Sequence, residues 1–302
     1  MDSLVLYDWV SFTSKIHSPE DIIELLGINS TWENIKGAHG YKDRLYCGSI
    51  SIHYNGREDM GIWVEMSGQG CRYFESFGHG DYNLIFQEIH NNPDEMNLTR
   101  LDIAFDDHEK ILNIDVLADD TLKQNYISKS TEWEVSQSSK GTTIYIGSMK
   151  SDVLIRIYDK AAERGYTDGT VWTRVELQLR DSRALQYTKL KSSVGENFRA
   201  VLHNYLKYVI PSEDTNKSRW EITEYWYRLI QAVAKQSIYL KMGVDYNIYR
   251  CENYVYNQAG NAAAALISAY GVTEFLDKLE KRPVMRNNKY DKMIKEYKES
   301  LK

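Results

Sequence analysis

The middle of the chain contains three segments in which apolar and polar residues alternate with the two-residue period of a β-strand. These segments are residues 97–107, 153–160 and 171–180. Each has one apolar side, and each carries an ionisable residue near the middle of its polar side: Asp102, Tyr158 and Glu176. Aspartate is disfavoured inside strands, so Asp102 in the middle of a strand suggests a functional role. If the strands are neighbours in one sheet, about 4.8 Å apart, the three side chains meet on one face.

Tyr158 has the most distinctive surroundings of the three. Arg156 and Lys160 flank it on the same side of the strand, each about 6.6 Å away at two residues' rise. A tyrosine titrates at about pH 10, and it becomes a nucleophile when positive charge or a metal favours its phenolate. The flanking charge therefore makes Tyr158 a candidate nucleophile, with Arg156 and Lys160 as candidate activating cations. The alternative is a surface strand whose polar side faces water.

The two acids are candidate metal ligands. Mg²⁺ and Mn²⁺ favour oxygen ligands and keep several waters, so Asp102 and Glu176 on adjacent strands could hold one ion. Asp106 lies four residues from Asp102, about 13 Å along a strand, so both are not expected to bind the ion directly. Asp106 and Gln178 are expected to support the site from just outside the ligand pair. No two of the seven histidines stand two residues apart, which disfavours a histidine-based metal site.

The pattern along the whole chain predicts an α+β fold. We expect a largely antiparallel sheet with helices on one side, built from two similar halves and followed by a helical C-terminal region. The expected parts are residues 1–96, residues 97–182 with the charged strands, and residues 183–302.

The first part begins with a predicted strand at Val5–Thr13. A helix follows that Ser18 caps and Gly27 ends, with strands near 44–54 and 61–66. The glycine-rich residues 68–70 and 78–80 are interpreted as turns. Helices are expected at residues 114–123, 197–209, 220–241 and 260–270.

Composition and charge add limits. The net charge of −6 is unfavourable for binding DNA, but the segment Lys278–Lys302 holds nine Lys and Arg against four acids, and such a tail can contact phosphates. Three cysteines predict a reducing compartment and no disulfide framework. There is no apolar run of about 18 residues and no export signal. We therefore expect a cytoplasmic protein without a membrane partner.

The charged strands also carry a family resemblance. Four segments occur in the order Thr99–Asp106, Tyr145–Ser148, Ile155–Lys160 and Trp172–Leu179. This ordered set resembles the Rep_trans replication initiation factors, which include the initiators of staphylococcal rolling-circle plasmids and the NicK and MobT relaxases of integrative conjugative elements. The resemblance implies that Tyr158 attacks a DNA phosphate and becomes joined to the 5′ end. It also implies that Asp102 and Glu176 form the metal site.

The predicted function is thus strand-specific nicking and rejoining of origin DNA with Mg²⁺ or Mn²⁺ as cofactor. Lys150, Arg174 and Arg180 are predicted phosphate contacts on the strands and their connecting turn. The target phosphate must be exposed, so we expect a hairpin or melted origin and a host helicase as partner. A metal nuclease that uses water, a non-catalytic origin-binding protein and a structural protein remain as alternatives. The sequence leaves open monomer or homodimer, and plasmid, phage or conjugative element as host.

Overall fold

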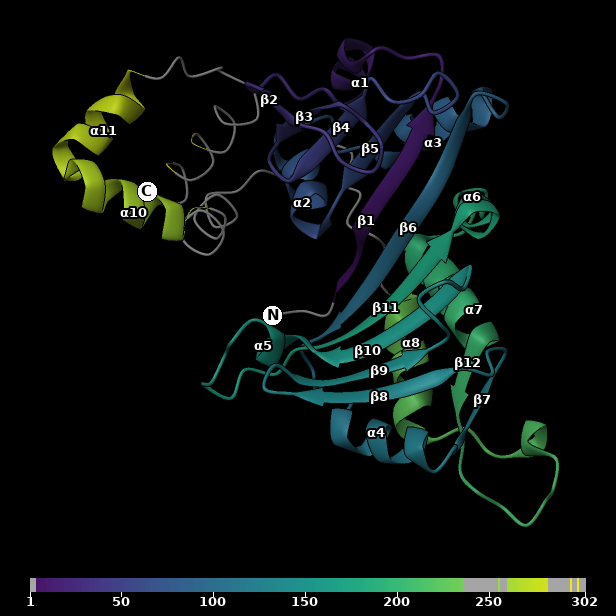
Figure 1. Cartoon of the computed structure of the whole chain (residues 1–302). Helices are drawn as coiled ribbons and strands as arrows, with labels where there is room; N and C mark the ends of the chain where they lie inside the picture. The colour runs from purple at the N-terminus through teal and green to yellow at the C-terminus, as the bar shows by residue number, and fades with distance from the viewer. Residues whose placement is uncertain (1–3, 236–254, 256–259, 282–293, 295–297, 299–302) are drawn as a thin grey trace. The chain divides into compact units, whose positions relative to one another are not determined.

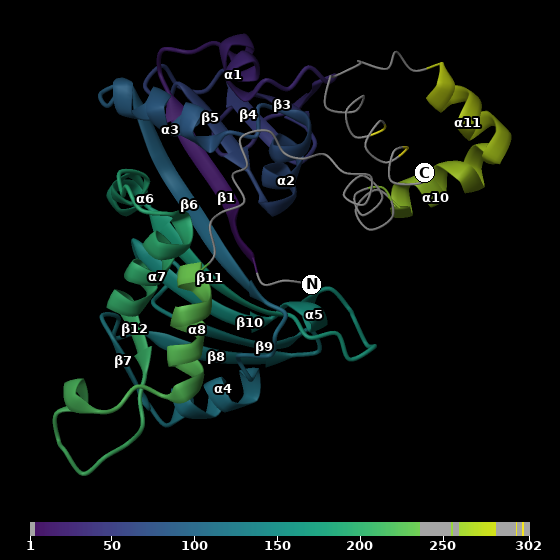
Figure 2. The ribbon, with the colours of Figure 1, turned by 180° about the vertical axis from the view of Figure 1, so that it is seen from behind.

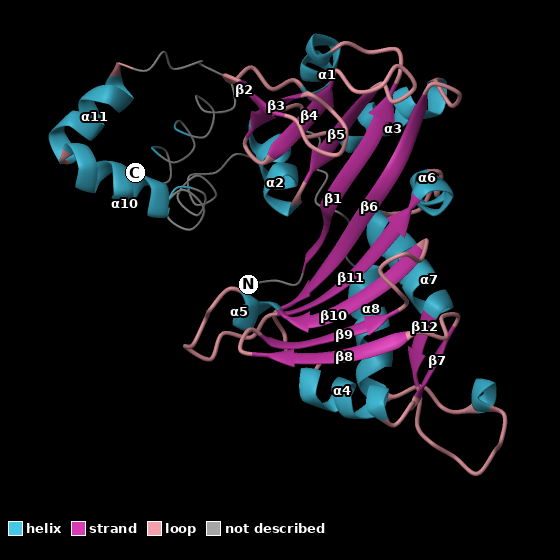
Figure 3. Cartoon of the chain, in the orientation of Figure 1, coloured by secondary structure: helices cyan, strands magenta, loops and turns pink. Residues whose placement is uncertain are grey.

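The computed structural model describes residues 4–235, 255, 260–281, 294 and 298. The chain divides into two compact units, residues 1–240 and residues 241–302. The first unit contains a ten-stranded sheet in which every pairing is antiparallel (Figure 3). The order of its strands is β2-β3-β4-β5-β1-β6-β11-β10-β9-β8.

The N-terminal half of the sheet contains five strands and three helices. The strands are β1 (Leu4–Ser14), β2 (Glu33–Lys36), β3 (Asp43–Cys47), β4 (Ile50–Tyr54) and β5 (Ile62–Met66). The helices are α1 (Pro19–Leu26), α2 (Gly68–Phe77) and α3 (Tyr82–Asn91). As predicted, Ser18 caps α1 and Gly27 ends it, in the left-handed conformation that glycine adopts without strain. Asp21 completes a capping box with Ser18.

The second half begins with the long strand β6 and contributes four further strands to the same sheet. Its strands are β6 (Met96–Asp107), β8 (Trp133–Ser138), β9 (Gly141–Ile146), β10 (Val153–Asp159) and β11 (Thr173–Arg180). Its helices are α4 (Ile114–Leu122), α5 (Lys160–Glu163), α6 (Asp181–Thr188), α7 (Val194–Tyr205) and α8 (Glu224–Lys235), with a 3₁₀ turn η1 (Lys217–Arg219). Two short strands, β7 (Tyr126–Ser128) and β12 (Leu206–Tyr208), pair separately.

The two halves repeat one arrangement about the central pair β1–β6. In the first half the order from edge to centre is β2-β3-β4-β5-β1, and in the second it is β8-β9-β10-β11-β6. Each half therefore starts with the long central strand, adds its other strands from the edge inward, and ends beside the strand with which it began. The two sets of strands form one continuous sheet.

The core lies on one side of this sheet. Apolar residues of alternate strand positions, such as Phe12, Phe105 and Ile157, join buried side chains of the helices, such as Phe74 and Phe198, in one cluster. Figures 1 and 2 show α4, α7 and α8 on the same side of the second half. We call the opposite side of the sheet, which bears Asp102, Glu176 and Tyr158, the polar face. The prediction of an α+β fold with helices on one side is confirmed.

Some local predictions are wrong. The glycines at 68 and 70 lie in α2 rather than in a turn, since Ser67 caps this helix and its backbone passes close to the β3–β4 hairpin. A Cβ atom at Gly70 would lie 2.4 Å from the carbonyl oxygen of Ser49, so only glycine fits. Residues 44–54 form two strands, β3 and β4, joined by a tight turn at Gly48 and Ser49. Residues 206–208 leave the helix predicted over 197–209 and pair with β7.

The second unit is described through α10 (Gly260–Tyr270) and α11 (Val272–Glu280). Helix α10 has the bounds predicted from its alanine-rich sequence. The basic segment Lys278–Lys302 lies mostly outside the described residues. No helix in the described part of the chain is long and apolar enough to cross a membrane.

Candidate active site

The order of the strands brings the three ionisable residues together. Strands β6, β11 and β10 are consecutive neighbours, so Asp102, Glu176 and Tyr158 share the polar face. Arg156 is directly opposite Glu176, and Tyr158 is directly opposite Arg174. Asp102 pairs with Gln178 rather than with Glu176, so the two acids approach each other diagonally. Glu176 thereby lies between Asp102 and the phenol.

Tyr158 is 8% exposed, and its hydroxyl has two polar partners. The hydroxyl donates a hydrogen bond to Glu176 Oε2 at 3.3 Å, and Lys160 Nζ donates to the hydroxyl oxygen at 3.4 Å. Burial raises the pKa of Tyr158 well above its usual range, Glu176 raises it further, and Arg174 opposes both. The sequence predicted the opposite direction from the flanking cations. That expectation needs correction, because burial and a carboxylate outweigh them and keep the phenol protonated.

The two cations that flank Tyr158 are themselves paired. Arg156 bonds to Glu176 Oε1, and its guanidinium carbon lies 6.0 Å from the centre of the Tyr158 ring. Lys160 is 5% exposed and pairs with Glu163 one helical turn onward. Burial lowers the pKa of Lys160, and Arg174 lowers it further. The structure therefore places one cation against the neighbouring acid and the other against the phenol oxygen.

Asp102 is held by an arginine that the sequence reading did not single out. Arg100 Nε and Nη2 donate to the two carboxylate oxygens of Asp102 at 2.9 and 2.5 Å. The guanidinium also stacks on Trp9, 4.3 Å from the ring centre. Burial raises the pKa of Asp102 to about 7, and Glu176 raises it while Arg100 lowers it. The available signal was strand alternation, which puts Arg100 on the side of Asp102.

A second ion-pair cluster lies beside Tyr158. Arg174 is 4% exposed and donates to Asp106 Oδ1 and Oδ2, both at 2.7 Å, and to Asp8 Oδ2 at 2.6 Å. Asp8 comes from β1, at a register shift between Tyr7 and Trp9. Sequence reasoning missed Asp8, since this bulge breaks the alternation that would have assigned it to a face. Arg174, predicted as a phosphate contact, has its guanidinium engaged by two carboxylates.

The remaining predicted site residues lie farther from the phenol. Gln178 is 1% exposed and sits beside Asp102. Lys150 is exposed in the turn that precedes β10, at the end of this strand opposite Tyr158. Arg180 lies at the same end and donates to the carbonyl oxygen of Met149 at 3.3 Å. The structure thus places Lys150 and Arg180 near each other and away from Tyr158.

The donor chemistry of the acids suits a divalent cation. Among the described residues, no group of three or more His, Cys, Asp or Glu side chains is placed to hold a metal ion. Asp102 and Glu176 nevertheless lie close together, since Arg156 lies near both carboxylates and Glu176 raises the pKa of Asp102. Two such carboxyl groups supply the oxygen ligands that Mg²⁺ or Mn²⁺ takes, with water and phosphate completing the shell. A cation bound there would compete with Arg100 and Arg156 for the same oxygens.

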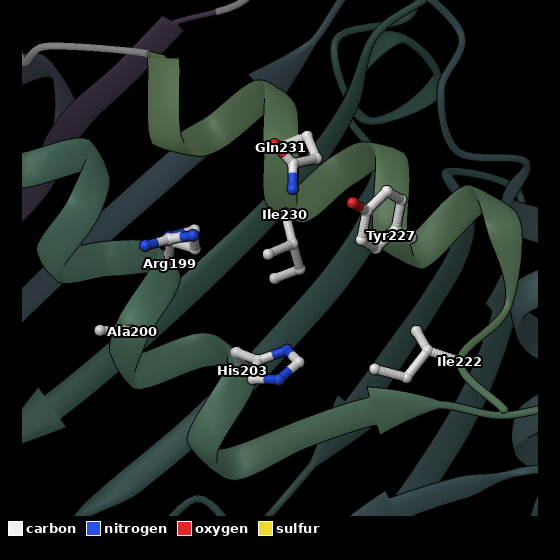
Figure 4. Close-up of a pocket in the computed structure, with 7 residues that line it drawn as sticks. All are labelled: Arg199, Ala200, His203, Ile222, Tyr227, Ile230 and Gln231. Carbon is white, nitrogen blue, oxygen red and sulfur yellow. The ribbon is translucent and has the colours of Figure 1, made fainter. Parts of the chain in front are cut away.

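A cavity of about 440 Å³ lies elsewhere in this unit, between α7 and α8. Figure 4 shows Arg199 and His203 on one helix facing Tyr227 and Ile230 on the other. These helices pack on the core side of the sheet, so the cavity is separate from the site around Tyr158.

Comparison with known proteins agrees with this fold. Residues 96–281 match the model of the Rep_trans family, described as replication initiation factor, so the chain belongs to that family. Residues 4–88 match the rolling circle replication initiation protein N-terminal domain. The resemblance inferred from the four ordered segments is confirmed.

Two relatives are similar over most of their length. The first is "Putative DNA relaxase NicK" of Bacillus subtilis (strain 168), which is 26% identical over 97% of this chain and 89% of the relative. The second is the solved structure of a rolling circle replication initiator protein from Geobacillus stearothermophilus. It is 29% identical, covers 78% of this chain and 98% of its own, and has a TM-score of 0.72.

Proposed function

We propose that this protein is a DNA-nicking enzyme that cuts and rejoins one strand at an origin through a 5′-phosphotyrosine intermediate on Tyr158. The observation that carries the proposal is the phenol oxygen of Tyr158 between the Glu176 carboxylate at 3.3 Å and the Lys160 ammonium at 3.4 Å. This arrangement occurs in a member of the replication initiation factor family. A nucleophile, a proton acceptor and a cation thus converge at one point.

The residues divide the chemistry as follows. Glu176 accepts the hydrogen bond of the phenol, so it is placed to take the proton as the phenol oxygen attacks phosphorus. The new bond joins the tyrosine oxygen to the 5′ phosphate, and the bond to the 3′ oxygen breaks. That oxygen takes up a proton and leaves as a 3′-hydroxyl. Lys160 lies within reach of the same phosphate and offsets its developing charge.

The cofactor in this proposal is Mg²⁺ or Mn²⁺ held by Asp102 and Glu176. A bound cation would act as a Lewis acid on a phosphate oxygen and favour the phenolate. Asp106, with Asp8, holds Arg174 beside Tyr158, and Gln178 packs beside Asp102. Their proposed role is to position the groups that touch DNA.

The partners follow from the chemistry. The DNA must expose the target phosphate, as in a hairpin or a melted origin, and a host helicase would extend the opening. Lys150 and Arg180, at the far end of β10 and β11, are proposed contacts to the DNA backbone beyond the nick. The region from residue 183 onward is proposed to recognise the origin or a partner. The proposed setting is the cytoplasm, with a plasmid or a conjugative element as host.

The test is a denaturing gel of labelled origin DNA incubated with the protein and Mn²⁺. We expect a covalent, protease-sensitive adduct that Tyr158→Phe abolishes while DNA affinity stays unchanged. Tyr145→Phe is the matched control, because Tyr145 lies on the polar face one strand away, opposite Arg156. Cleavage that survives Tyr158→Phe without an adduct would show a water nucleophile and overturn the proposal. The raised pKa of Tyr158 makes this metal nuclease the second candidate.

A further inference from the structure

Buried side-chain nitrogen atoms without a hydrogen-bond partner occur on the polar face both at the site around Tyr158 and beyond it. Several buried side-chain nitrogen atoms of the described residues lack a hydrogen-bond partner, and six of them belong to polar-face residues: Trp9, Arg44, His53, Arg156, Gln178 and Arg180. Buried polar atoms are normally paired, so the unpartnered nitrogen atoms of Arg44 and His53 in the first half are free to bond to a ligand. Phosphate and base oxygens are acceptors for such groups.

The internal repeat relates part of this set to the active site. In the second half, directly paired positions run Thr143–Tyr158–Arg174–Asp106 across β9, β10, β11 and β6. In the first half, the corresponding strands β3, β4, β5 and β1 carry the row Arg44–His53–Trp63–Thr13. His53 is thus the counterpart of Tyr158, each being the last residue but one of its strand.

The counterpart row contains no tyrosine and no carboxylate, but aromatic rings gather around it. His53 stacks on Trp63 with ring centres 4.7 Å apart, and His39 meets Trp63 edge-on at 5.2 Å. Tyr41 lies 5.7 Å from His53. His39 is exposed and holds a left-handed backbone at φ 56°, a conformation uncommon for residues other than glycine. The rings are therefore gathered by both strand register and an unusual loop conformation.

Positive charge accompanies the rings. Arg44 forms no ion pair among the described residues, and its Nε is buried without a partner. Burial raises the pKa of Glu65, while His39, Arg100 and Arg44 oppose the rise, so these three side chains lie around one acid on the polar face. Rings combined with unpaired guanidinium donors are the features by which proteins hold single-stranded nucleic acid.

We propose that His39, Arg44 and Trp63, supported by the buried His53 ring that stacks on Trp63, form a second, non-catalytic site that holds single-stranded DNA flanking the nick. The inference rests on the proposed DNA-nicking function of the same face. The two rows meet β6 at Asn97 and Asp106, nine residues apart, so the sites lie about 30 Å apart along the central strands. One strand of DNA would cross from the catalytic half to its inert counterpart along the polar face.

The test is the binding of fluorescein-labelled oligothymidylates of increasing length to the full chain, measured by anisotropy over a range of salt. We expect Trp63→Leu to weaken binding of the long oligomers about tenfold with an unchanged salt slope, since a stacking contact releases no counterions. Arg44→Gln should weaken binding and reduce the slope of log K against log salt by about 0.7. For short oligomers, the difference in affinity between each variant and the wild type should be smaller, because a short oligomer does not span both sites.

Three further variants make the result interpretable. His39→Asn removes an exposed ring while keeping a residue that tolerates the left-handed conformation, so it should weaken binding without disturbing the fold. Arg57→Gln and Tyr227→Leu are matched controls and should bind like the wild type. Arg57 is an exposed arginine of the same half paired with Asp59, and Tyr227 is an exposed aromatic residue on α8.

The outcomes separate this inference from the proposed function. Wild-type affinity and slope in Trp63→Leu, Arg44→Gln and His39→Asn would overturn the second site. Losses confined to duplex DNA would overturn the single-stranded assignment. If these variants lose oligothymidylate binding but the wild type forms no adduct with origin DNA, the nicking proposal fails and the second site stands.

Discussion

Arg100 donates hydrogen bonds to both carboxylate oxygens of Asp102, at 2.9 and 2.5 Å, while its guanidinium stacks on the ring of Trp9. The acid that we assign as a metal ligand is therefore already bound to a cation in the protein itself. A divalent ion bound there would compete with Arg100 for these two oxygens, and a displaced guanidinium would be free to meet a DNA phosphate. Metal and DNA should then bind more tightly together than separately.

The first prediction concerns pH. Burial and Glu176 raise the pKa of Asp102 to about 7, so below this pH a metal must displace a proton. We expect the Mn²⁺ affinity of the DNA-free protein to fall about tenfold per unit of pH below about 7 and to level off above it. Mn²⁺ titration followed by electron paramagnetic resonance measures this directly. In Arg100→Gln the pKa of Asp102 should be higher, because Arg100 lowers it, and the profile should move to higher pH. A pH-independent affinity would contradict the assignment of Asp102.

The second prediction concerns Glu176. Glu176→Gln removes a charged ligand and the carboxylate that accepts the phenol proton, so the metal concentration for half-maximal nicking should rise at least about tenfold. The pKa of Tyr158 should fall as well, because Glu176 is one of the groups that raise it, although burial keeps it above the usual value. Metal titration of nicking and ultraviolet titration of the phenol check the two effects. An unchanged metal titration would mean that Glu176 is not a ligand.

The third prediction concerns the cluster around Arg174. Asp106→Ala leaves the buried guanidinium with Asp8 as its only carboxylate partner among the described residues, so the free energy of unfolding should fall by about 3 kcal/mol. Urea denaturation measures this loss. Asp119→Ala is the control, since Asp119 pairs with Lys123 on the surface of α4 and its removal should leave the urea midpoint nearly unchanged. Equal effects of the two changes would show that the buried cluster contributes no special stability.

The fourth prediction concerns α2. Helix propensity alone makes Gly70→Ala stabilising, but the new Cβ atom would lie 2.4 Å from the carbonyl oxygen of Ser49. We expect the contact to dominate and the protein to lose about 2 kcal/mol of stability. Thermal unfolding decides the sign. Gln69→Ala, at the neighbouring exposed position of the helix, should have little effect, and a higher melting temperature for Gly70→Ala would refute the close packing.

Much of the site could be predicted because strand alternation assigns each residue to a face. Asp102, Tyr158 and Glu176 lie on one side of three neighbouring strands, as their spacing indicated. Alternation gives no register between strands, so it did not show that Asp102 pairs with Gln178 and meets Glu176 diagonally. It also failed at Asp8, where a bulge interrupts the period.

The electrostatics of Tyr158 needed the folded structure. Neighbours along the strand suggested an acidic phenol, but the pKa depends on burial and on Glu176, which is supplied by another strand. The same holds for α2, whose glycines looked like turn residues in sequence. Their role is the close approach to Asp8 and Ser49, which are distant along the chain.

The antiparallel pairing of β1 with β6 determines which truncated fragments of this protein can remain soluble. A fragment lacking residues 1–95 would leave β6, twelve residues long, as an unprotected sheet edge. A long exposed edge strand can pair with strands of other chains, so such a fragment should aggregate or form oligomers. It would also leave Arg174 without Asp8. The catalytic strands are thus not a detachable module, and minimal versions of this protein must begin at or before β1.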